Sequence, residues 1–174
     1  MTIDIQSMPD ARVDQGSFRR VMARFPSFVA VITTDTHSGP AGCTATAVLS
    51  LSLDPASILL SLRSEGRTLN DIRASGAFAV NVLSWQQRDF ARQFATGDPR
   101  RRFDGVAHSH MNGVPVLDDC SATVVCRLQE AIEVLDHTLL IGTAERATSG
   151  TDAPMVLLDG QSHRIPDVAD FRSL

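Results

Sequence analysis

Short apolar runs separated by turn residues recur along most of this chain. Runs of four to eight apolar residues bounded by Gly, Pro, Asp or Asn are typical of strands, because they are too short for a buried helix. The pattern predicts strands at 28–34, 41–49, 57–62, 77–83, 120–135, 137–147, 154–158 and 161–165. Strands at this spacing, many of them joined by hairpins, favour a mainly β domain built as an antiparallel barrel.

Helical periodicity is confined to three short segments. Ser17 is predicted to cap a helix over 18–25 that ends at Pro26, a second helix begins near Leu69, and a third covers 84–94. Residues 97–102 and 103–115 are predicted to be a loop and an irregular segment. Residues 1–14 read as a polar tail before a single domain at 15–174, and the pair Asp159-Gly160 predicts a two-residue hairpin that closes the sheet.

The stretch 42–73 carries the candidate chemistry. Two β-rich runs, 42–53 and 57–62, are followed by the polar loop Arg63-Ser64-Glu65-Gly66-Arg67-Thr68. A predicted helix comes directly after this loop. Arginine side chains, hydroxyls and the amides of a helix N-terminus together suit a phosphate group. A solvated turn in front of a capped helix fits the same residues.

Other polar positions are ambiguous from pattern alone. Thr44 and Thr46 are expected on one side of a strand, where they either line a site or face solvent. His108 and His110 have the spacing of a metal pair but lack nearby cysteines or carboxylates besides Asp104, so we predict a solvated loop and no metal. A hydrolase triad lacks any motif that would bring its members together.

Composition narrows the function classes. The net charge is −4 and every one of the 16 basic residues is arginine, which argues against nucleic acid as a partner and excludes lysine chemistry. No G-x-G-x-x-G motif is present, so nicotinamide binding of the Rossmann kind is excluded. The polar N-terminus and the lack of a long apolar run predict a cytoplasmic protein with no membrane partner, and the three cysteines read as reduced thiols.

Four segments in this order resemble the short-chain flavin reductase family. They are G-x-T-A-x-A-x-x-S-x-S-L-D-P at 42–55, L-R-x-x-x-R-T-L at 62–69, G-A-F-A-V-N-V-L at 76–83 and D-H-T-L-L-I-G at 136–142. The resemblance extends from about Phe18 to about Arg164. It implies a split β-barrel homodimer that reduces FMN or FAD with NADH or NADPH and supplies reduced flavin to a partner monooxygenase or halogenase.

The resemblance also implies roles for single residues. Arg63, Ser64, Arg67 and Thr68 would hold the flavin phosphate. Thr44, Ala45 and Thr46 would meet the ring edge, Asn81 is a weaker polar candidate, and His137 would orient the nicotinamide as the catalytic residue. Hydride would pass from nicotinamide C4 to flavin N5 without a protein nucleophile.

The sequence departs from the family pattern at two of these places. Leu135 stands where the family has the glycine of G-D-H, and Glu65-Gly66 replaces a frequent Ser-Ser. A carboxylate at 65 would oppose a phosphate unless it turns away or pairs with an arginine. Two other functions therefore stay open: a flavin carrier or chaperone without reductase turnover, and an interaction module of the same fold. The choice between FMN and FAD, and between NADH and NADPH, also stays open.

Overall fold

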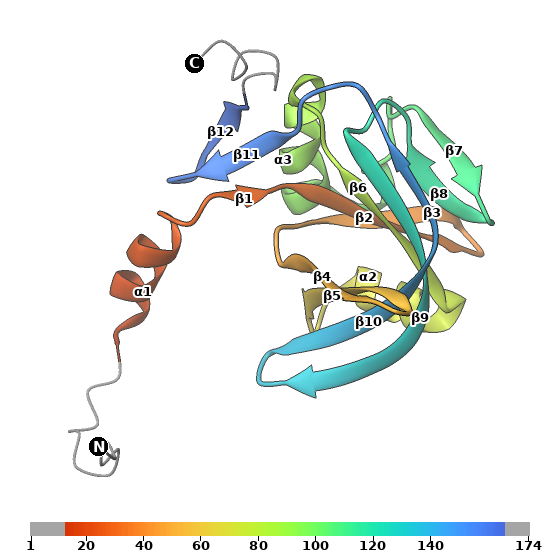
Figure 1. The fold of residues 1–174 in the computed structure, drawn as a ribbon, viewed down its shortest axis with the longest axis horizontal. Helices are drawn as coiled ribbons and strands as arrows, with labels where there is room; N and C mark the ends of the chain where they lie inside the picture. Colours follow the sequence, from red (N-terminus) through yellow and green to blue (C-terminus); the bar gives the residue numbers. More distant parts are fainter. Residues whose placement is uncertain (1–12, 166–174) are drawn as a thin grey trace.

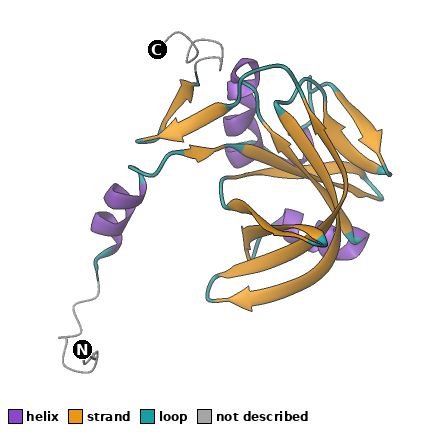
Figure 2. Cartoon of the chain, viewed as in Figure 1, coloured by secondary structure: helices purple, strands orange, loops and turns teal. Residues whose placement is uncertain are grey.

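Residues 13–165 are described by the computed structural model, so most of the polar tail at 1–14 lies outside the described residues. Seven antiparallel strands form the main sheet in the order β3-β2-β6-β9-β10-β5-β4 (Figure 1; Figure 2). Their bounds are Ala30–Thr36 for β2, Gly39–Ala45 for β3, Val48–Leu53 for β4, Ala56–Arg63 for β5, Ala77–Val82 for β6, Ala122–Val134 for β9 and His137–Ser149 for β10.

The two edge strands of this sheet, β3 and β4, are consecutive in the chain. Thr46 and Ala47 carry the backbone from one edge to the other, and Ser61 N donates a 2.9 Å hydrogen bond to the Ala47 carbonyl as β4 begins. The run 42–53 was predicted as one β-rich segment, and this crossing divides it. The mainly β fold is confirmed, but within the described residues β3 and β4 are not paired, so the strongly curved sheet is not closed into a barrel.

The main core lies on the concave side of the sheet and under α2. Leu60, Phe78 and Leu140 are fully buried there, and burying side chains of this size stabilises the fold by about 1.5–3 kcal/mol each. Gly142 is needed beside them, because a Cβ at this position would lie 2.6 Å from the Phe78 ring. A second core cluster around Phe94 joins α3 to the other face of β2.

Residues 13–165 also form three α-helices and two short 3-10 turns. They are α1 Gln15–Met22, α2 Arg67–Ser75, η2 Trp85–Gln87, α3 Arg88–Thr96 and η3 Pro99–Arg101. The cap of α1 is Asp14, whose carboxylate accepts from Ser17 N at 2.9 Å, so the predicted Ser17 cap is wrong by three residues. The helix α2 ends at Gly76, whose positive φ of 73° favours glycine.

Two sequence predictions about the remaining strands were wrong. The segment 103–115, expected to be irregular, contains β7 His108–Met111 and β8 Val114–Leu117, joined by Asn112 and Gly113 with positive φ values of 53° and 79°. Asn-Gly is a strong hairpin signal, and it was overlooked. The hairpin of β11 Met155–Leu158 and β12 Gln161–Arg164 does form at Asp159-Gly160, but it pairs with β1 Ser27–Phe28 in a separate sheet.

Candidate functional site

A cavity of about 410 Å³ opens where the first turn of α2 faces the end of β3 and the start of η3. Arg63, Arg67 and Thr68 line it, as the sequence predicted for a phosphate site. Thr44 lines it as well. The other lining residues are Cys43, Leu62, Gly66, Leu69, Ala95, Pro99 and Arg102. The structure therefore brings together residues from five separate elements, β3, β5, α2, α3 and η3.

The N-terminus of α2 is fixed at this cavity by its buried face. Leu69 and Ile72 are both completely buried in the main core, which sets the direction of the helix. Gly66 precedes the helix and has no side chain to cap its first amides. These amides carry the positive end of the helix dipole, so they are available to an anion at the cavity wall.

Arg102 supplies a second positive group at the same wall. Its Nη1 donates a 2.7 Å hydrogen bond to the Gly42 carbonyl, and its own carbonyl accepts from Gln93 Nε2 at 2.7 Å. Its Nε atom is buried and has no hydrogen-bond partner among the described residues. A buried guanidinium donor without a partner is costly unless a ligand satisfies it. Arg102 is thus positioned by protein contacts with one donor left for a bound group.

The Cys43 thiol lies close to both Thr68 and Arg102. Burial raises the pKa of its thiol, while a hydrogen bond with Thr68 and the charge of Arg102 act in the opposite direction. The thiol is therefore neutral at physiological pH. It contributes an apolar surface to the cavity between the Thr68 hydroxyl and the Arg102 guanidinium.

Ser64 and Glu65 line a neighbouring cavity of about 310 Å³. The Ser64 hydroxyl lies 2.9 Å from the Thr138 hydroxyl, and its amide donates to the Asp136 carbonyl at 3.0 Å. Glu65 does not line the cavity of Arg67 and Thr68, so its carboxylate does not compete with an anion there. Arg63 lines both cavities and separates them.

The three positions predicted to meet the ring edge are in different environments. The Thr44 hydroxyl donates to the Ala91 carbonyl at 2.7 Å and keeps its oxygen available as an acceptor. The Ala45 side chain is 8% exposed and belongs to the main core, so only its backbone can contact a ligand. Thr46 is exposed on the crossing after β3 and does not line the cavity. The prediction that Thr44 and Thr46 share one face of a strand was wrong, because β3 ends at Ala45.

His137 begins β10 directly opposite Arg63, the last residue of β5. Its Nδ1 lies 2.8 Å from Asp136 Oδ1, and its side chain is half-exposed. This hydrogen bond, followed by the charge of the imidazole, lowers the pKa of the Asp136 carboxyl below its ordinary value. His137 is therefore oriented by its neighbour, and part of its side chain is open to solvent.

Asn81 is not at this site. It is completely buried in β6, where its Nδ2 donates to the Val31 carbonyl and the Thr33 hydroxyl and its Oδ1 accepts from Leu117 N. All of these hydrogen bonds connect β2, β6 and β8. The predicted cofactor role of Asn81 is contradicted, because its polar atoms are used inside the protein and none faces the cavity.

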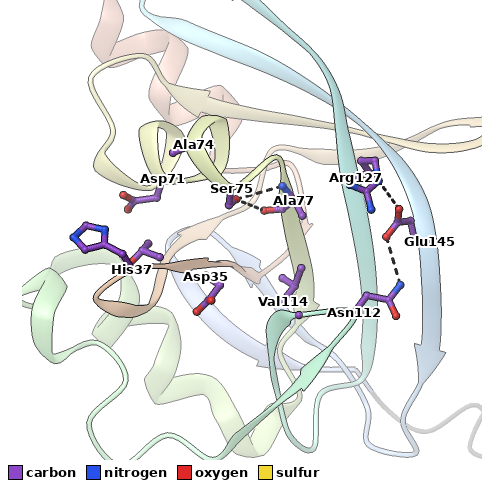
Figure 3. Close-up of a pocket in the computed structure, with 12 residues that line it drawn as sticks. Asp35, His37, Asp71, Ala74, Ser75, Ala77, Asn112, Val114, Arg127 and Glu145 are labelled. Carbon is purple, nitrogen blue, oxygen red and sulfur yellow. Dashed lines mark hydrogen bonds and ion pairs between the residues drawn. The ribbon is translucent and has the colours of Figure 1, made fainter.

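A larger cavity lies elsewhere, between the β2–β3 turn, the end of α2 and the β7–β8 turn (Figure 3). Its volume is about 610 Å³, and none of the predicted site residues lines it. Three of its polar side chains are paired with one another: Arg127 pairs with Glu145 at 2.6 Å, and Asn112 donates to the same carboxylate at 3.4 Å. Within the described residues there is also no cluster of three or more His, Cys, Asp or Glu side chains that could hold a metal.

Arg102 and Cys43 are the site residues that the sequence reasoning missed. Arg102 belongs to a run of three consecutive arginines at 100–102, an available signal that was not assigned to the flavin phosphate. Which of the three faces the cavity depends on the turn of η3. That turn places Arg102 at the wall and directs Arg101 into an exposed pair with Asp104.

Comparison with known proteins assigns this sequence and fold to a protein class. Residues 22–166 match the sequence family described as "Flavin reductase like domain". The NADH-dependent FMN reductase AsuE2 of Streptomyces nodosus subsp. asukaensis is 38% identical over 144 residues, covering 76% of this chain and 77% of that protein. The reductase component of a 4-nitrophenol monooxygenase from Rhodococcus opacus is 30% identical, covering 88% and 83%.

A solved structure of a flavin reductase has the same fold as this chain. The NADH:FAD oxidoreductase SgcE6 of Streptomyces globisporus, in complex with NAD and FAD fragments, superimposes with a TM-score of 0.83. It is 30% identical, and the superposition covers 90% of this chain and 96% of that one. The similarity therefore extends over most of both chains.

Proposed function

Since the chain belongs to the flavin reductase-like family, we propose that the cavity beside α2 binds the flavin that this protein reduces. The protein is an NAD(P)H-dependent flavin reductase, as its family and the relatives named above indicate. The observation that carries the site assignment is the convergence of Arg67, Thr68 and Arg102 on one wall, with the Nε donor of Arg102 unpaired.

The residues of this wall fit a flavin phosphate. Arg63 and Arg67 present guanidinium groups, the uncapped amides of α2 add donors, and Arg102 adds the donor that lacks a partner. A phosphate on this wall replaces water with charge-assisted hydrogen bonds, which are about twice as strong as neutral ones. Thr44, Cys43 and Leu62 continue the cavity away from the phosphate wall and provide the mixed polar and apolar lining that a ring system needs.

The cofactors supply the redox chemistry, in which a hydride passes from nicotinamide C4 to flavin N5. The protein holds the flavin through Arg63, Arg67, Thr68 and Arg102. His137 orients the nicotinamide from the face that it shares with Arg63, and Asp136 holds the imidazole through a 2.8 Å contact. No residue forms a bond to substrate. Catalysis on the protein side consists of placing two ring systems together and excluding water between them.

We also propose that the active protein is a homodimer. Strand β4 and the β9–β10 hairpin expose apolar side chains, each between 39% and 99% accessible: Leu49, Leu51, Leu53, Ile132, Val134 and Leu135. The register places Leu49 beside Leu59 and Ile132 beside Leu139, on the face opposite to the buried Leu60 and Leu140. Exposed apolar side chains gathered on one face support an interface between copies.

Helix α1 adds a second unpartnered apolar surface. It stands away from the body of the protein, none of its residues is buried, and Phe18, Val21 and Met22 are each at least 43% exposed (Figure 1). An isolated helix of eight residues is not stable in water, so its apolar face needs a contact. The second copy of this chain provides one and supports the dimer.

We propose that the reduced flavin passes from this protein to another enzyme. We propose a flavin-dependent monooxygenase or halogenase in the cytoplasm as the recipient; the R. opacus relative is such a reductase component. No helix among the described residues is long and apolar enough to cross a membrane.

The test is steady-state oxidation of NADH and NADPH by the purified chain with FMN or FAD. Turnover with at least one flavin is expected. Flavin binding without turnover would favour a flavin carrier over a reductase. If the chain neither binds nor reduces flavin, the result would favour an interaction module.

A further inference from the structure

Arg102 supplies the unpaired donor of the proposed flavin site, yet it lies outside the regular helices and strands. It directly follows the three-residue turn η3, within the segment 97–104. The two arginines before it form ion pairs, at 3.2 Å and 2.9 Å, with aspartates of this same segment, so these pairs do not attach the segment to the rest of the protein. The position of Arg102 therefore depends on contacts with other elements.

Gln93 on α3 makes such a contact. Its Nε2 atom donates a 2.7 Å hydrogen bond to the Arg102 carbonyl and a 3.1 Å hydrogen bond to the Asp104 carbonyl. A side-chain amide carries two N–H donors, so one glutamine makes both bonds. Gln93 thus holds the main chain on both sides of Phe103.

Phe103 adds an apolar contact with the same helix. Its ring packs edge-to-face against that of Phe94, with a centroid distance of 5.1 Å and an angle of 84° between the planes, and Phe94 is completely buried. The helix is also joined to β3, because Thr44 donates to the Ala91 carbonyl at 2.7 Å. Helix α3 is therefore a fixed support between β3 and the segment that carries Arg102.

Both ends of Arg102 are held in this arrangement. Gln93 binds its carbonyl, and the Gly42 carbonyl of β3 accepts a 2.7 Å hydrogen bond from its Nη1. A guanidinium that is already in place loses little conformational freedom when it binds an anion. Without the bonds from Gln93, the ligand itself has to order the segment around Arg102, and the affinity falls.

We propose that Gln93 is a positioning residue for the flavin phosphate and acts through Arg102. The inference rests on the proposed flavin site. Gln93 does not line the cavity, so it contributes nothing by direct contact with the ligand. Its influence is confined to the part of the flavin that Arg102 binds, which is the phosphate.

The probes are FMN and riboflavin, which share the ring and the ribityl chain and differ in the phosphate. Quenching of flavin fluorescence by the full chain measures both dissociation constants. Gln93→Met removes both donors and keeps the length of the side chain. It is expected to raise the dissociation constant of FMN by about threefold to tenfold and to leave that of riboflavin within about twofold of wild type. An equal loss for both flavins means that the substitution disturbs the whole cavity, and it overturns the inference.

A double-mutant cycle tests the path through Arg102 and does not depend on how tightly riboflavin binds. Arg102→Met by itself weakens FMN binding. In that background, Gln93→Met is expected to weaken FMN binding by less than about a further twofold, because residues that act as one unit are not additive. If the two effects multiply in the double variant, Gln93 acts independently of Arg102 and the inference is wrong.

Gln87→Met is the matched control. Gln87 lies in η2, is 8% exposed and donates a 2.6 Å hydrogen bond from Nε2 to the Asp118 carbonyl, but it does not line the cavity. Loss of this bond is expected to lower the melting temperature and to leave both dissociation constants unchanged. A loss of FMN binding alone in this variant as well would show that the effect is not specific to Gln93, and it would overturn the inference.

Failure of this inference differs from failure of the proposed function. A wild-type chain that binds FMN, together with a Gln93→Met variant that binds it equally well, refutes only the role of Gln93. A wild-type chain that binds neither FMN nor FAD refutes the flavin site itself and this role with it.

Discussion

Arg63 and His137 lie directly opposite each other where β5 ends and β10 begins. Residues opposite each other in an antiparallel pair place their side chains on the same face of the sheet. The arginine next to the flavin cavity and the histidine predicted for the nicotinamide therefore share one surface, although they are far apart in the sequence. This surface continues into the exposed apolar face of β4, β5, β9 and β10, so we expect flavin binding, reduction and assembly to depend on adjacent residues.

The first prediction concerns the phosphate wall. Arg67→Ala is expected to weaken flavin binding by about 1–3 kcal/mol, because it removes a charge-assisted hydrogen bond to the phosphate. Titration with flavin fluorescence measures the dissociation constant. Arg73→Ala is the control: it lies in the last turn of the same helix and pairs with Glu133 at 3.1 Å, away from the cavity. An unchanged dissociation constant for Arg67→Ala would remove this residue from the site.

The second prediction concerns His137. His137→Ala is expected to keep the flavin affinity and to lower kcat/KM for NADH by about tenfold to a hundredfold, the effect of losing an orienting contact of ~1–3 kcal/mol. His110→Ala, at an exposed histidine of β7, is the control and should leave both quantities unchanged. If His137 only packs at the strand end, its removal changes stability and not kinetics.

The third prediction concerns the pH dependence of the neighbouring carboxyl. The pKa of Asp136 is lowered by its hydrogen bond to His137, so its contribution to stability is present above the ordinary pKa of an unfolded aspartate. That contribution is lost as the pH falls through the lower native value. In His137→Ala the pKa of Asp136 is expected to rise toward its ordinary value, as followed by carboxyl-carbon NMR. Asp98, whose pKa is lowered by Arg100, should not change in this variant.

The fourth prediction concerns the buried thiols. Burial raises the pKa values of Cys120 and Cys126 to about 12, and these residues are 7% and 0% exposed. Both are expected to resist alkylation in the native protein at mildly alkaline pH and to react after denaturation. Because their native pKa values lie above the unfolded value of 9.0, stability should fall as the pH rises from 9.0 towards 12. Rapid native labelling of either thiol, identified by mass spectrometry, would contradict their burial.

The fifth prediction concerns assembly. Light scattering is expected to give a mass of about 38 kDa, twice the chain mass of 18.8 kDa. Leu51→Asp should shift the protein toward the monomer, since it places a charge in the exposed apolar face of β4. Ile165→Asp is the control, because Ile165 is an exposed apolar residue (37%) outside that face. A wild-type monomer at micromolar concentration would argue against a site shared between copies.

The local sequence pattern determined those helices and strands that depend on residues close together in the chain. The β2–β3 and β11–β12 hairpins follow from turn residues between short apolar runs, and α2 follows from a polar loop, a buried Leu69 and a terminal Gly76. The Asn112-Gly113 hairpin was equally local and was simply overlooked. The phosphate-binding candidates Arg67 and Thr68 were also within reach, because they begin a helix whose first amides have no side-chain cap.

Only the tertiary structure decided which polar residues face a cavity. Asn81 reads as a polar candidate on a strand, yet three hydrogen bonds from β2 and β8 use its side chain in the core. Arg102 reads as one of three loop arginines, yet its bond to Gly42, 60 residues away, fixes it at the cavity wall. The sequence determines which side chains can bind an anion. Contacts between distant segments decide which of these side chains already have hydrogen-bond partners inside the protein. A ligand binds the side chains that do not.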